Sequence, residues 1–235
     1  MAGKGGKIKV YKFRELGSAE DLERGLKIIE TGEFWCSKFS ELNDPMEGVF
    51  NAYSLTEIDK VYSEKNKMLV CSFSGEKGFK NPLMWGYYAC GFRGYVIEAE
   101  IDEKGMEKMT YSDKRVTVSR DREDYEATVK KILLRKSPSW KHEDEYRFFC
   151  TTQKWKIGEI KCIYFGIPYF GMQNENEIRE GSKSLLAYHE RMGRLKAAIP
   201  LKSGISYRDV YIKNGKVEIN DASVASPSVL KVGEK

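Results

Sequence analysis

The segment that decides how we interpret the fold is Trp140-Lys-His-Glu-Asp-Glu-Tyr-Arg-Phe-Phe149. From Glu143 onward its side chains alternate as a β-strand requires, because successive residues of a strand point to opposite faces. One face carries Glu143, Glu145 and Arg147. The other face carries Tyr146, Phe148 and Cys150, which can pack against a core. The sequence therefore predicts a strand that presents two carboxylates and a guanidinium on one side.

The acidic face of this strand allows two interpretations. Two carboxylates this close repel and perturb each other's ionisation, so Arg147 or a bound ligand must compensate them. Alternatively, the face is open to water and carries a surface ion pair that contributes little to stability. The residue types alone leave both interpretations open.

The length of 235 residues suits one domain, and the 41% of hydrophobic residues supply enough apolar material for its core. We expect a flexible Gly/Lys leader at residues 1–7, a single domain at 8–221 and a disordered tail at 222–235. The leader lacks the apolar segment of a secretory signal, and no apolar run approaches the length of a membrane span. We therefore expect no membrane association.

The cysteines and histidines indicate the compartment and argue against a metal centre. Five scattered cysteines without close pairs favour reduced thiols in the cytoplasm over a disulfide framework or a zinc site. The two histidines, His142 and His189, are too few for a His-rich metal centre. A net charge of +5 is compatible with a nucleic-acid or nucleotide partner but does not require one.

Hydrophobic periodicity and turn residues predict short strands that alternate irregularly with helices. The expected strands are residues 7–13, 34–37, 68–74, 94–101, a segment around Tyr111, 143–149 and 160–165, with a hairpin at 210–219 that turns at Asn214-Gly215. The expected helices lie between Ser18 and Gly32 and at 55–66, 83–90, 122–135 and 177–198, and 75–80 is expected to be a polar loop. Strict strand–helix–strand repetition is missing, so we expect an α+β fold with a mixed, mostly antiparallel sheet and flanking helices.

The motifs of several enzyme classes are absent from the sequence. It has no Gly-x-Ser-x-Gly elbow, no Walker loop and no His-Glu-x-x-His helix. What remains is the Glu143-x-Glu145 pair, together with aromatic residues that supply flat apolar walls for a ring. Paired carboxylates can stabilise an oxocarbenium-like transition state in glycosyl transfer, or one can hold a ribose hydroxyl while the other orients an acceptor.

A set of short motifs occurs in one order along the chain. They are Tyr11-Lys-Phe13, Leu42-Asn-Asp-Pro45, Cys71-Ser-Phe-Ser74, Leu83-Met-Trp85 with Tyr88, Gly94-Tyr95, Lys136 with Trp140, and Glu143-x-Glu145-x-Arg147. Together they resemble the bacterial and phage-related "domain of unknown function 2971" family, over about Val10 to Gly166. That family name carries no established activity.

The layout is also similar, more distantly, to ADP-ribosyltransferases, in which NAD binds in a cleft of a split, mixed sheet. The shared features are an early strand motif, a strand that ends in Ser-x-Ser and a late Glu-x-Glu. The resemblance implies that Glu145 is the catalytic carboxylate, which holds the nicotinamide-ribose hydroxyl, and that Glu143 positions the acceptor. A shifted register would exchange these two roles.

The same resemblance implies a set of NAD contacts. They are Ser72 or Ser74 at the nicotinamide ribose and Tyr11 or Arg14 at the adenosine ribose or phosphates. Trp85, Tyr88 and Arg147 are further candidates for the binding cleft, although the apolar composition of residues 83–90 favours a core position for Trp85 over ligand stacking. The early motif departs from the family pattern, because Tyr11-Lys12 stands where a central His or Arg is usual.

These resemblances imply a cytoplasmic enzyme that transfers ADP-ribose from NAD, as a substrate and without a metal, to nucleic acid or protein. They also imply a toxin or phage-defence setting, with an antitoxin or other protein as a possible partner. The alternative is a non-enzymatic module that binds a nucleotide, nucleic acid or protein through the same aromatic cleft. A third option is another enzyme that acts on RNA, such as a glycosidase or a phosphotransferase.

Overall fold

The computed structural model describes residues 6–44, 46–118, 124–170, 182–199 and 204–220. Its centre is a single sheet to which nine strands of the described chain belong. In spatial order they are β15 (Lys216–Asn220), β14 (Ser206–Lys213), β13 (Glu159–Gly166), β6 (Gly94–Asp102), β1 (Lys7–Glu15), β5 (Leu69–Ser74), β11 (Glu145–Cys150) and β7 (Glu107–Lys108), and β3 (Ser37–Lys38) also pairs with β5.

Three pairs of short strands lie outside this sheet. They are β8 (Thr110–Tyr111) with β10 (Arg135–Lys136), β2 (Phe34–Trp35) with β12 (Lys154–Trp155), and β4 (Phe50–Asn51) with β9 (Val116–Thr117). In the central sheet the β13–β14 pair is parallel, and the other neighbouring strands are antiparallel. The predicted α+β class with a mixed, mostly antiparallel sheet is confirmed.

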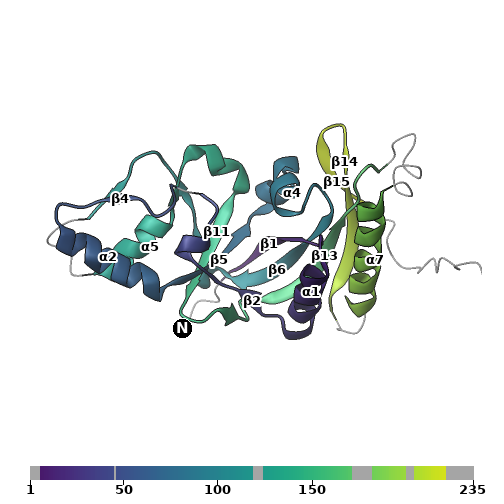
Figure 1. The fold of residues 1–235 in the computed structure, drawn as a ribbon, viewed down its shortest axis with the longest axis horizontal. Coiled ribbons are helices and arrows are strands. Elements are labelled where there is room, and N and C mark those ends of the chain that lie inside the picture. The colour runs from purple at the N-terminus through teal and green to yellow at the C-terminus, as the bar shows by residue number, and fades with distance from the viewer. Residues whose placement is uncertain (1–5, 45, 119–123, 171–181, 200–203, 221–235) are drawn as a thin grey trace, which may run out of the picture.

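The helices cover both faces of the sheet and one end of it. They are α1 (Ala19–Thr31), α2 (Leu55–Lys67), α3 (Glu76–Phe79), α4 (Pro82–Tyr88), α5 (Tyr125–Leu133) and α7 (Lys183–Ala198), with 3₁₀ turns η1 (Phe39–Glu41), η2 (Glu103–Gly105) and η3 (Pro138–Glu143). Helices α1 and α7 lie together near one end of the molecule, and α2 and α5 lie together at the other end (Figure 1). The described part of the chain holds no helix with the length and apolar character needed to cross a membrane.

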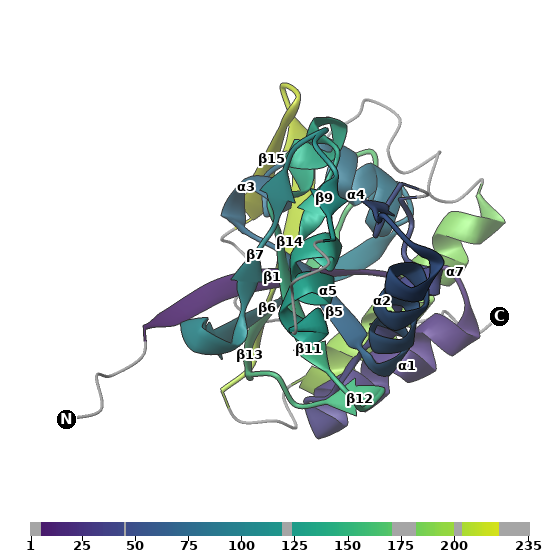
Figure 2. The same cartoon turned by 90° about the vertical axis from the view of Figure 1, so that its left-hand side faces the viewer.

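Strand alternation divides the core into two layers across β1. Val10 packs with side chains of α1 and α7, whereas Tyr11 and Phe13 pack with side chains of α3 and α4. Viewed from the side, α3 and α4 lie on one side of β1 and α1 on the other (Figure 2). A third cluster lies under α2 and α5 and includes Val70 of β5.

The sheet opens between β1 and β5. Strand β1 is paired with β6 along its whole length, from Lys7 to Glu15, but with β5 at one residue pair, Tyr11 and Ser74. Beyond that pair the two strands diverge. Lys12 spans the opening, because its Nζ donates a hydrogen bond of 2.6 Å to the backbone carbonyl of Ser72. This opening gives side chains of both strands access to one space.

The local signals of helix and turn formation are the most accurate part of the sequence prediction. Ser18 caps α1 through a capping box with Asp21, and Gly32 ends that helix in the left-handed region at φ 71°. The predicted hairpin is confirmed, since Asn214 and Gly215 both have positive φ between β14 and β15.

Three predicted boundaries need correction. Residues 75–80 are not a loop, because Phe79 is buried and the chain forms helix α3 to place it there. The predicted strand starts at Glu145 and not at Glu143, because Pro138 begins a 3₁₀ turn and Asp144 adopts φ 48°. Lys7 belongs to β1 and not to the leader. The remaining leader residues 1–5, the tail 222–235, and the predicted helical residues 122–123 and 177–181 lie outside the described residues.

Candidate functional site

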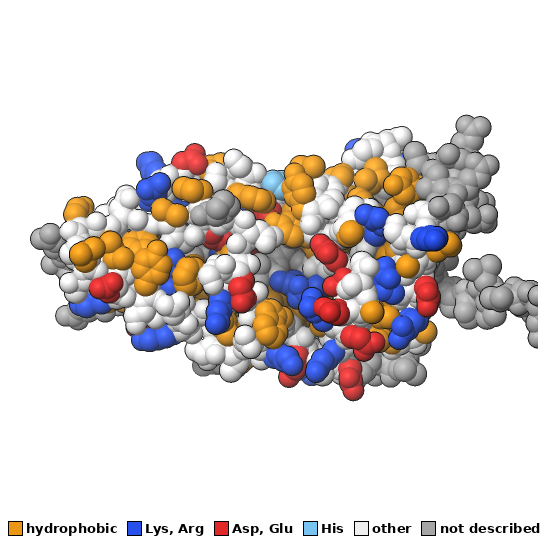
Figure 3. Space-filling model, in the orientation of Figure 1, with side chains coloured by type: hydrophobic (Ala, Val, Ile, Leu, Met, Phe, Trp, Pro, Cys, Tyr) orange, Lys and Arg blue, Asp and Glu red, His pale blue; other side chains and the backbone are white. Residues whose placement is uncertain are grey.

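A cavity of about 220 Å³ occupies the opening between β1 and β5. Strand β1 contributes residues 11–14, and β5 contributes Ser72 and Ser74. Side chains from β11, β10, η3 and α4 also line it, namely Glu145, Arg147, Lys136, Glu143, Met84 and Tyr88. The remaining side is formed by Ser37, Glu41, Leu42, Asn43 and Glu47. The corresponding face of the molecule is hollowed near its middle, with Lys or Arg side chains along the hollow (Figure 3).

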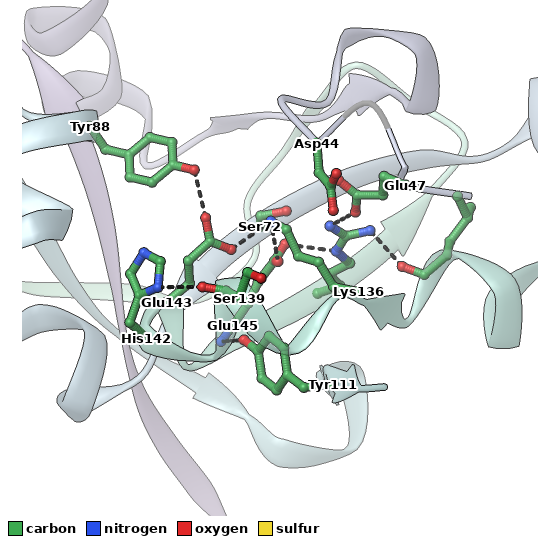
Figure 4. A network of polar contacts seen from close by, with 12 residues as sticks. Asp44, Glu47, Ser72, Tyr88, Tyr111, Lys136, Ser139, His142, Glu143 and Glu145 are labelled. Atoms are coloured by element: carbon green, nitrogen blue, oxygen red, sulfur yellow. Dashed lines mark hydrogen bonds and ion pairs between the residues drawn. The ribbon is translucent and has the colours of Figure 1, made fainter. Parts of the chain in front are cut away.

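Glu145 lies at the centre of the polar network, as Figure 4 shows. It is the first residue of β11 and pairs with Ser74 of β5, so the two side chains share a face of the sheet. Its Oε1 accepts a hydrogen bond of 2.7 Å from Nε of Arg147, and its Oε2 lies 3.2 Å from Nζ of Lys136. Burial raises the pKa of Glu145, Lys136 lowers it and Glu143 raises it, with a net pKa of about 6. The net effect of burial and of these neighbours is a pKa above the ordinary value of a glutamate.

Glu143 reaches the same cavity from η3. Tyr88 donates a hydrogen bond of 2.6 Å to its Oε1, and Lys136 Nζ lies 2.5 Å from its Oε2. Burial and the hydrogen bond to Glu143 raise the pKa of Tyr88, so the phenol stays protonated and acts as a donor. Burial opposes the charge of Lys136, but the carboxylates of Glu145 and Glu143 outweigh it and raise the Lys136 pKa.

Arg147 anchors the other side of the network. The side chain is 1% exposed and pairs across the sheet with Ser72. It contacts Glu145 through Nε and Glu47 through Nη2, and Nη1 donates a hydrogen bond of 2.5 Å to the carbonyl of Leu133. Burial lowers the pKa of Arg147 to about 9, so the guanidinium stays charged at neutral pH. Two cations, Lys136 and Arg147, thus face three carboxylates inside the protein, so these five groups carry one negative charge in excess when all are ionised.

Strand β1 supplies the opposite wall of the cavity. The Tyr11 ring stacks on Phe79 at 4.4 Å between centroids, which fixes its orientation. Burial raises the pKa of Tyr11 and lowers that of Lys12. Arg14 of the same strand lines both this cavity and a second one.

This second cavity, of about 780 Å³, adjoins the first. The two share Phe13, Arg14, Glu41 and Tyr88 as lining residues. The second one is bounded by α1 and β2, and its wall includes Arg24, Lys27 and the half-exposed ring of Trp35. The two spaces are therefore adjacent, with the buried carboxylates on the first and α1 on the second.

The structure brings most of the predicted site residues together. Glu143, Glu145, Tyr11, Arg14, Ser72, Ser74, Tyr88 and Arg147 all line the first cavity, while their predicted roles remain predictions. Trp85 does not line it and is 0% exposed. Its ring faces the core, stacks on Phe92 and donates from Nε1 to the Phe79 carbonyl at 2.8 Å. On α4 its neighbours Met84 and Tyr88 point to the cavity instead, because residues four apart share a helix face.

Sequence reasoning missed several charged residues of the site, three of which make direct contacts in it. Lys136 binds both glutamates, Lys12 spans the sheet opening, and Glu47 contacts Arg147. Lys136 was noticed as a motif residue, but nothing in the sequence showed that β10 would bring it to η3. Glu47 follows the Asn-Asp-Pro turn, whose composition is typical of loops without a function.

In the part of the chain that the structure describes, the site contains no recognisable metal centre, and the chain has no counterpart among the known proteins with which it was compared. The described residues contain no cluster of three or more His, Cys, Asp or Glu side chains that could hold a metal ion. Comparison of the chain with protein-family models, with curated proteins and with solved structures gives no match. The interpretation of the site therefore depends on its own geometry.

A tight backbone contact holds Glu143 in place and leads to a prediction. Gly78 of α3 packs against the Glu143 carbonyl, and an added Cβ would overlap that oxygen. Gly78→Ala should therefore displace η3 and lower the free energy of unfolding by about 1–3 kcal/mol. The matched control is Gly86→Ala on α4, where an added Cβ meets no atom within 4 Å. That variant should be neutral or stabilised by up to about 1 kcal/mol, as read from denaturant unfolding. Equal losses in both variants would contradict the assigned contact.

Proposed function

We propose that the protein binds NAD in this pair of cavities and transfers its ADP-ribose to a nucleic-acid or protein acceptor. The observation that carries the proposal is the buried Glu145 carboxylate, which faces a cavity in the sheet opening together with Tyr88 and Ser72. An ADP-ribosyltransferase-like fold belongs to the same proposal, and the divergence of β1 from β5 supports it as a split of the sheet.

The chemistry assigned to Glu145 follows from its hydrogen bonds. A carboxylate has about four acceptor positions. Arg147, Lys136 and Ser72 use three of them, which leaves one for a ribose hydroxyl. As the nicotinamide–ribose bond breaks, positive charge develops on the ribose, and a carboxylate held in place stabilises it. Lys136 and Arg147 fix the carboxylate and favour its ionised form.

The two cavities differ in volume, so each is proposed to hold a different part of the dinucleotide. The first cavity, of about 220 Å³, is smaller than the 300–1,000 Å³ typical of ligand pockets, so it suits only the nicotinamide–ribose end. The second cavity, of about 780 Å³, has room for the remainder. Arg14 at the junction is the basic side chain proposed to meet the phosphates. The rest of the second cavity is mixed in charge, because Arg24, Lys27 and Lys154 share its lining with Glu15, Asp21, Glu33 and Glu41.

Glu143 is proposed to act on the acceptor. It lies on η3, accepts a hydrogen bond from Tyr88 and lines the same cavity as Glu145, so it is proposed to orient an attacking hydroxyl or amide toward the ribose. The net charge of +5 favours nucleic acid over protein as the acceptor. A toxin or phage-defence setting, with an antitoxin or other protein partner in the cytoplasm, remains part of the same proposal.

A second candidate function has one observation in its favour. Each side-chain oxygen of Glu143 and Glu145 already has a partner within the protein. A purely structural ion-pair network in a nucleotide-binding or nucleic-acid-binding module would have the same satisfied carboxylates.

Labelled NAD separates the two functions. The protein is incubated with NAD labelled in the adenylate and with a crude lysate, and the products are then treated with nuclease or with protease. A transferase should move label into a macromolecular fraction, and the treatment that releases the label identifies the acceptor class. Saturable NAD binding in calorimetry without any transfer would favour the binding module. If the protein neither binds NAD nor transfers label from it, NAD is not its ligand.

A further inference from the structure

A row of aromatic rings leads away from the first cavity along α4 and η3. It begins at Tyr88, which lines that cavity, and continues to Tyr87 on the same helix. From there it passes to His142 and Trp140 of η3, with neighbouring ring centroids 6.1 to 6.3 Å apart. We call these four residues the aromatic rim. Its inner end lies at Glu143, because Tyr88 donates a hydrogen bond of 2.6 Å to that carboxylate (Figure 4).

Contacts within the protein hold the two rings of η3 in place. Trp140 and His142 stack with 26° between their ring planes. The Nζ of Lys136 lies 4.8 Å from the Trp140 ring centroid, and the Nδ1 of His142 lies 3.0 Å from the carbonyl of Ser139. Side chains that are ordered before a ligand arrives lose little conformational entropy when it binds. The aromatic rim is therefore preorganised for a flat partner.

Tyr87 gives the aromatic rim an exposed apolar surface. Its side chain is 55% exposed, and Leu83, one turn earlier on α4, is 51% exposed. Residues four apart share a face of a helix, so these two side chains lie together. The rings of Tyr87 and the half-buried His142 meet edge to face. Large apolar side chains gathered on one exposed face are typical of a binding surface.

The exposed charges next to the aromatic rim are mainly positive. In residues 75–90 and 137–144, which carry the rim and α3, the exposed charged side chains are those of Glu76, Lys77, Lys80 and Lys141. Three lysines against one glutamate leave an excess of two positive charges. The less exposed Glu143 and Asp144 have their own cations, Lys136 and Lys108. This excess favours a partner that carries phosphates.

His142 has a hydrogen bond to offer to a ligand. A carbonyl only accepts, so Nδ1 donates to Ser139 and, in the neutral ring, Nε2 is an acceptor. This Nε2 is shielded from water and has no hydrogen-bond partner among the described residues. Buried polar atoms without a partner are uncommon in folded proteins. The amino group of a base inserted beside Tyr87 is a donor of the kind that Nε2 lacks.

We propose that the aromatic rim binds unpaired bases of single-stranded nucleic acid, with Tyr87 as the main stacking ring and Lys77 and Lys141 as contacts for the phosphates. Bases in a duplex are covered on both faces by their neighbours, so only an unpaired base offers a free face to Tyr87. The inference deepens the proposed function, on which it rests for the identity of the acceptor. A strand bound here has its bases next to Glu143.

Fluorescence anisotropy without NAD tests the binding itself. A short fluorescein-labelled strand of mixed sequence, as DNA and as RNA, is titrated with the full-length protein, and the same strand annealed to its complement is the duplex control. Saturable binding of either single strand, tighter than that of its duplex, is the expected result. Equal or tighter binding of the duplex, or no saturable binding, overturns the proposal.

Substitution of Tyr87 shows whether a ring does the binding. Tyr87→Ala should weaken binding of the single strand ~5- to 150-fold, the loss expected for one base–aromatic stack, whereas Tyr87→Phe should bind like the wild type. The matched control is Tyr53→Ala, because Tyr53 is 67% exposed but precedes α2 at the other end of the molecule. If Tyr87→Ala binds like the wild type, or if Tyr53→Ala is weakened equally, the aromatic rim is not the site.

Salt dependence tests the contribution of the lysines. Each of Lys77→Gln and Lys141→Gln should reduce the slope of log K against log salt concentration by ~0.7, the value for one phosphate contact of a single strand. An unchanged slope in both variants would overturn the assigned phosphate contacts.

The outcomes for the aromatic rim and for the proposed function are separable. Binding of the strand without any transfer of ADP-ribose would refute the transferase and support the rim. Transfer to a protein acceptor without binding of the strand would refute the rim and support the transferase.

Discussion

Glu145→Gln is expected to lower the rate of ADP-ribose transfer ~100- to 1,000-fold, which corresponds to ~3–4 kcal/mol of lost transition-state stabilisation. Glutamine keeps the size of the side chain and one acceptor oxygen but removes the charge that faces the developing cation. Single-turnover transfer from labelled NAD to the acceptor fraction measures the effect. NAD affinity should change much less than the rate, because the charge on the ribose develops only in the transition state.

The fold should survive this substitution, because each cation retains another carboxylate. Lys136 still contacts Glu143, and Arg147 still contacts Glu47. Glu143→Gln is the comparison variant, because it removes one negative charge from the same cavity while Lys136 retains its ion pair with Glu145. If Glu143→Gln abolishes transfer while Glu145→Gln is nearly as fast as the wild type, the two roles are exchanged. If both variants transfer at the wild-type rate, the carboxylates are structural.

The pH dependence of stability shows independently whether Glu145 is buried as described. Burial raises its pKa in the folded state from 4.5 to about 6, so the folded protein holds a proton there that the unfolded chain has already released. The contribution of Glu145 to the free energy of unfolding is therefore fully present below about pH 4.5 and is lost as the pH rises through about 6. The difference between the two pKa values corresponds to ~2 kcal/mol. Glu145→Gln should lack that decline when chemical denaturation is measured between pH 4.5 and 7.

Much of the architecture follows from local signals along the chain. Helix starts and hairpin turns depend on residues that are close in the sequence, so they can be predicted from it. Examples are the N-caps Ser18 and Asn81 and the Asn214-Gly215 turn. The failures arise where tertiary contacts decide. Phe79 makes a helix of a segment that is polar in composition, and Asp144 takes a left-handed conformation that delays the start of β11 by two residues.

The candidate site shows the same division. The Glu143, Glu145 and Arg147 pattern was visible because the three residues are close in sequence, and both glutamates do reach one cavity. Alternation in β11 gave the correct shared face for Glu145 and Arg147, although that face is the deeply buried one and Tyr146 and Phe148 on the other face remain partly exposed. Lys136 and Glu47 could not be predicted, because their positions depend on how β10 and the loop after η1 fold back onto β11.

Lys136→Met is expected to lower the free energy of unfolding by about 3–5 kcal/mol at pH 7. The lysine is 6% exposed, and its Nζ lies 2.5 Å from Glu143 and 3.2 Å from Glu145, so its removal leaves two buried carboxylates facing each other without their shared cation. Methionine retains the unbranched stem that lies under Trp140, where Nζ is 4.8 Å from the ring centroid, so lost packing contributes little. Urea unfolding followed by tryptophan fluorescence measures the change.

The matched control is Lys130→Met, which removes the same charge from an exposed pair with Glu126 on α5 and should cost under about 0.5 kcal/mol. The loss in Lys136→Met should shrink between pH 7 and pH 4.5, because protonation of Glu145, whose pKa is raised, removes one of the two unpaired charges. A second substitution, Glu143→Gln, should restore part of the stability in the Lys136→Met background while it destabilises the wild type. If the losses of the two substitutions simply add in the double variant, Lys136 and Glu143 do not interact. The role of Lys136 as the cation shared by Glu143 and Glu145 would then be wrong.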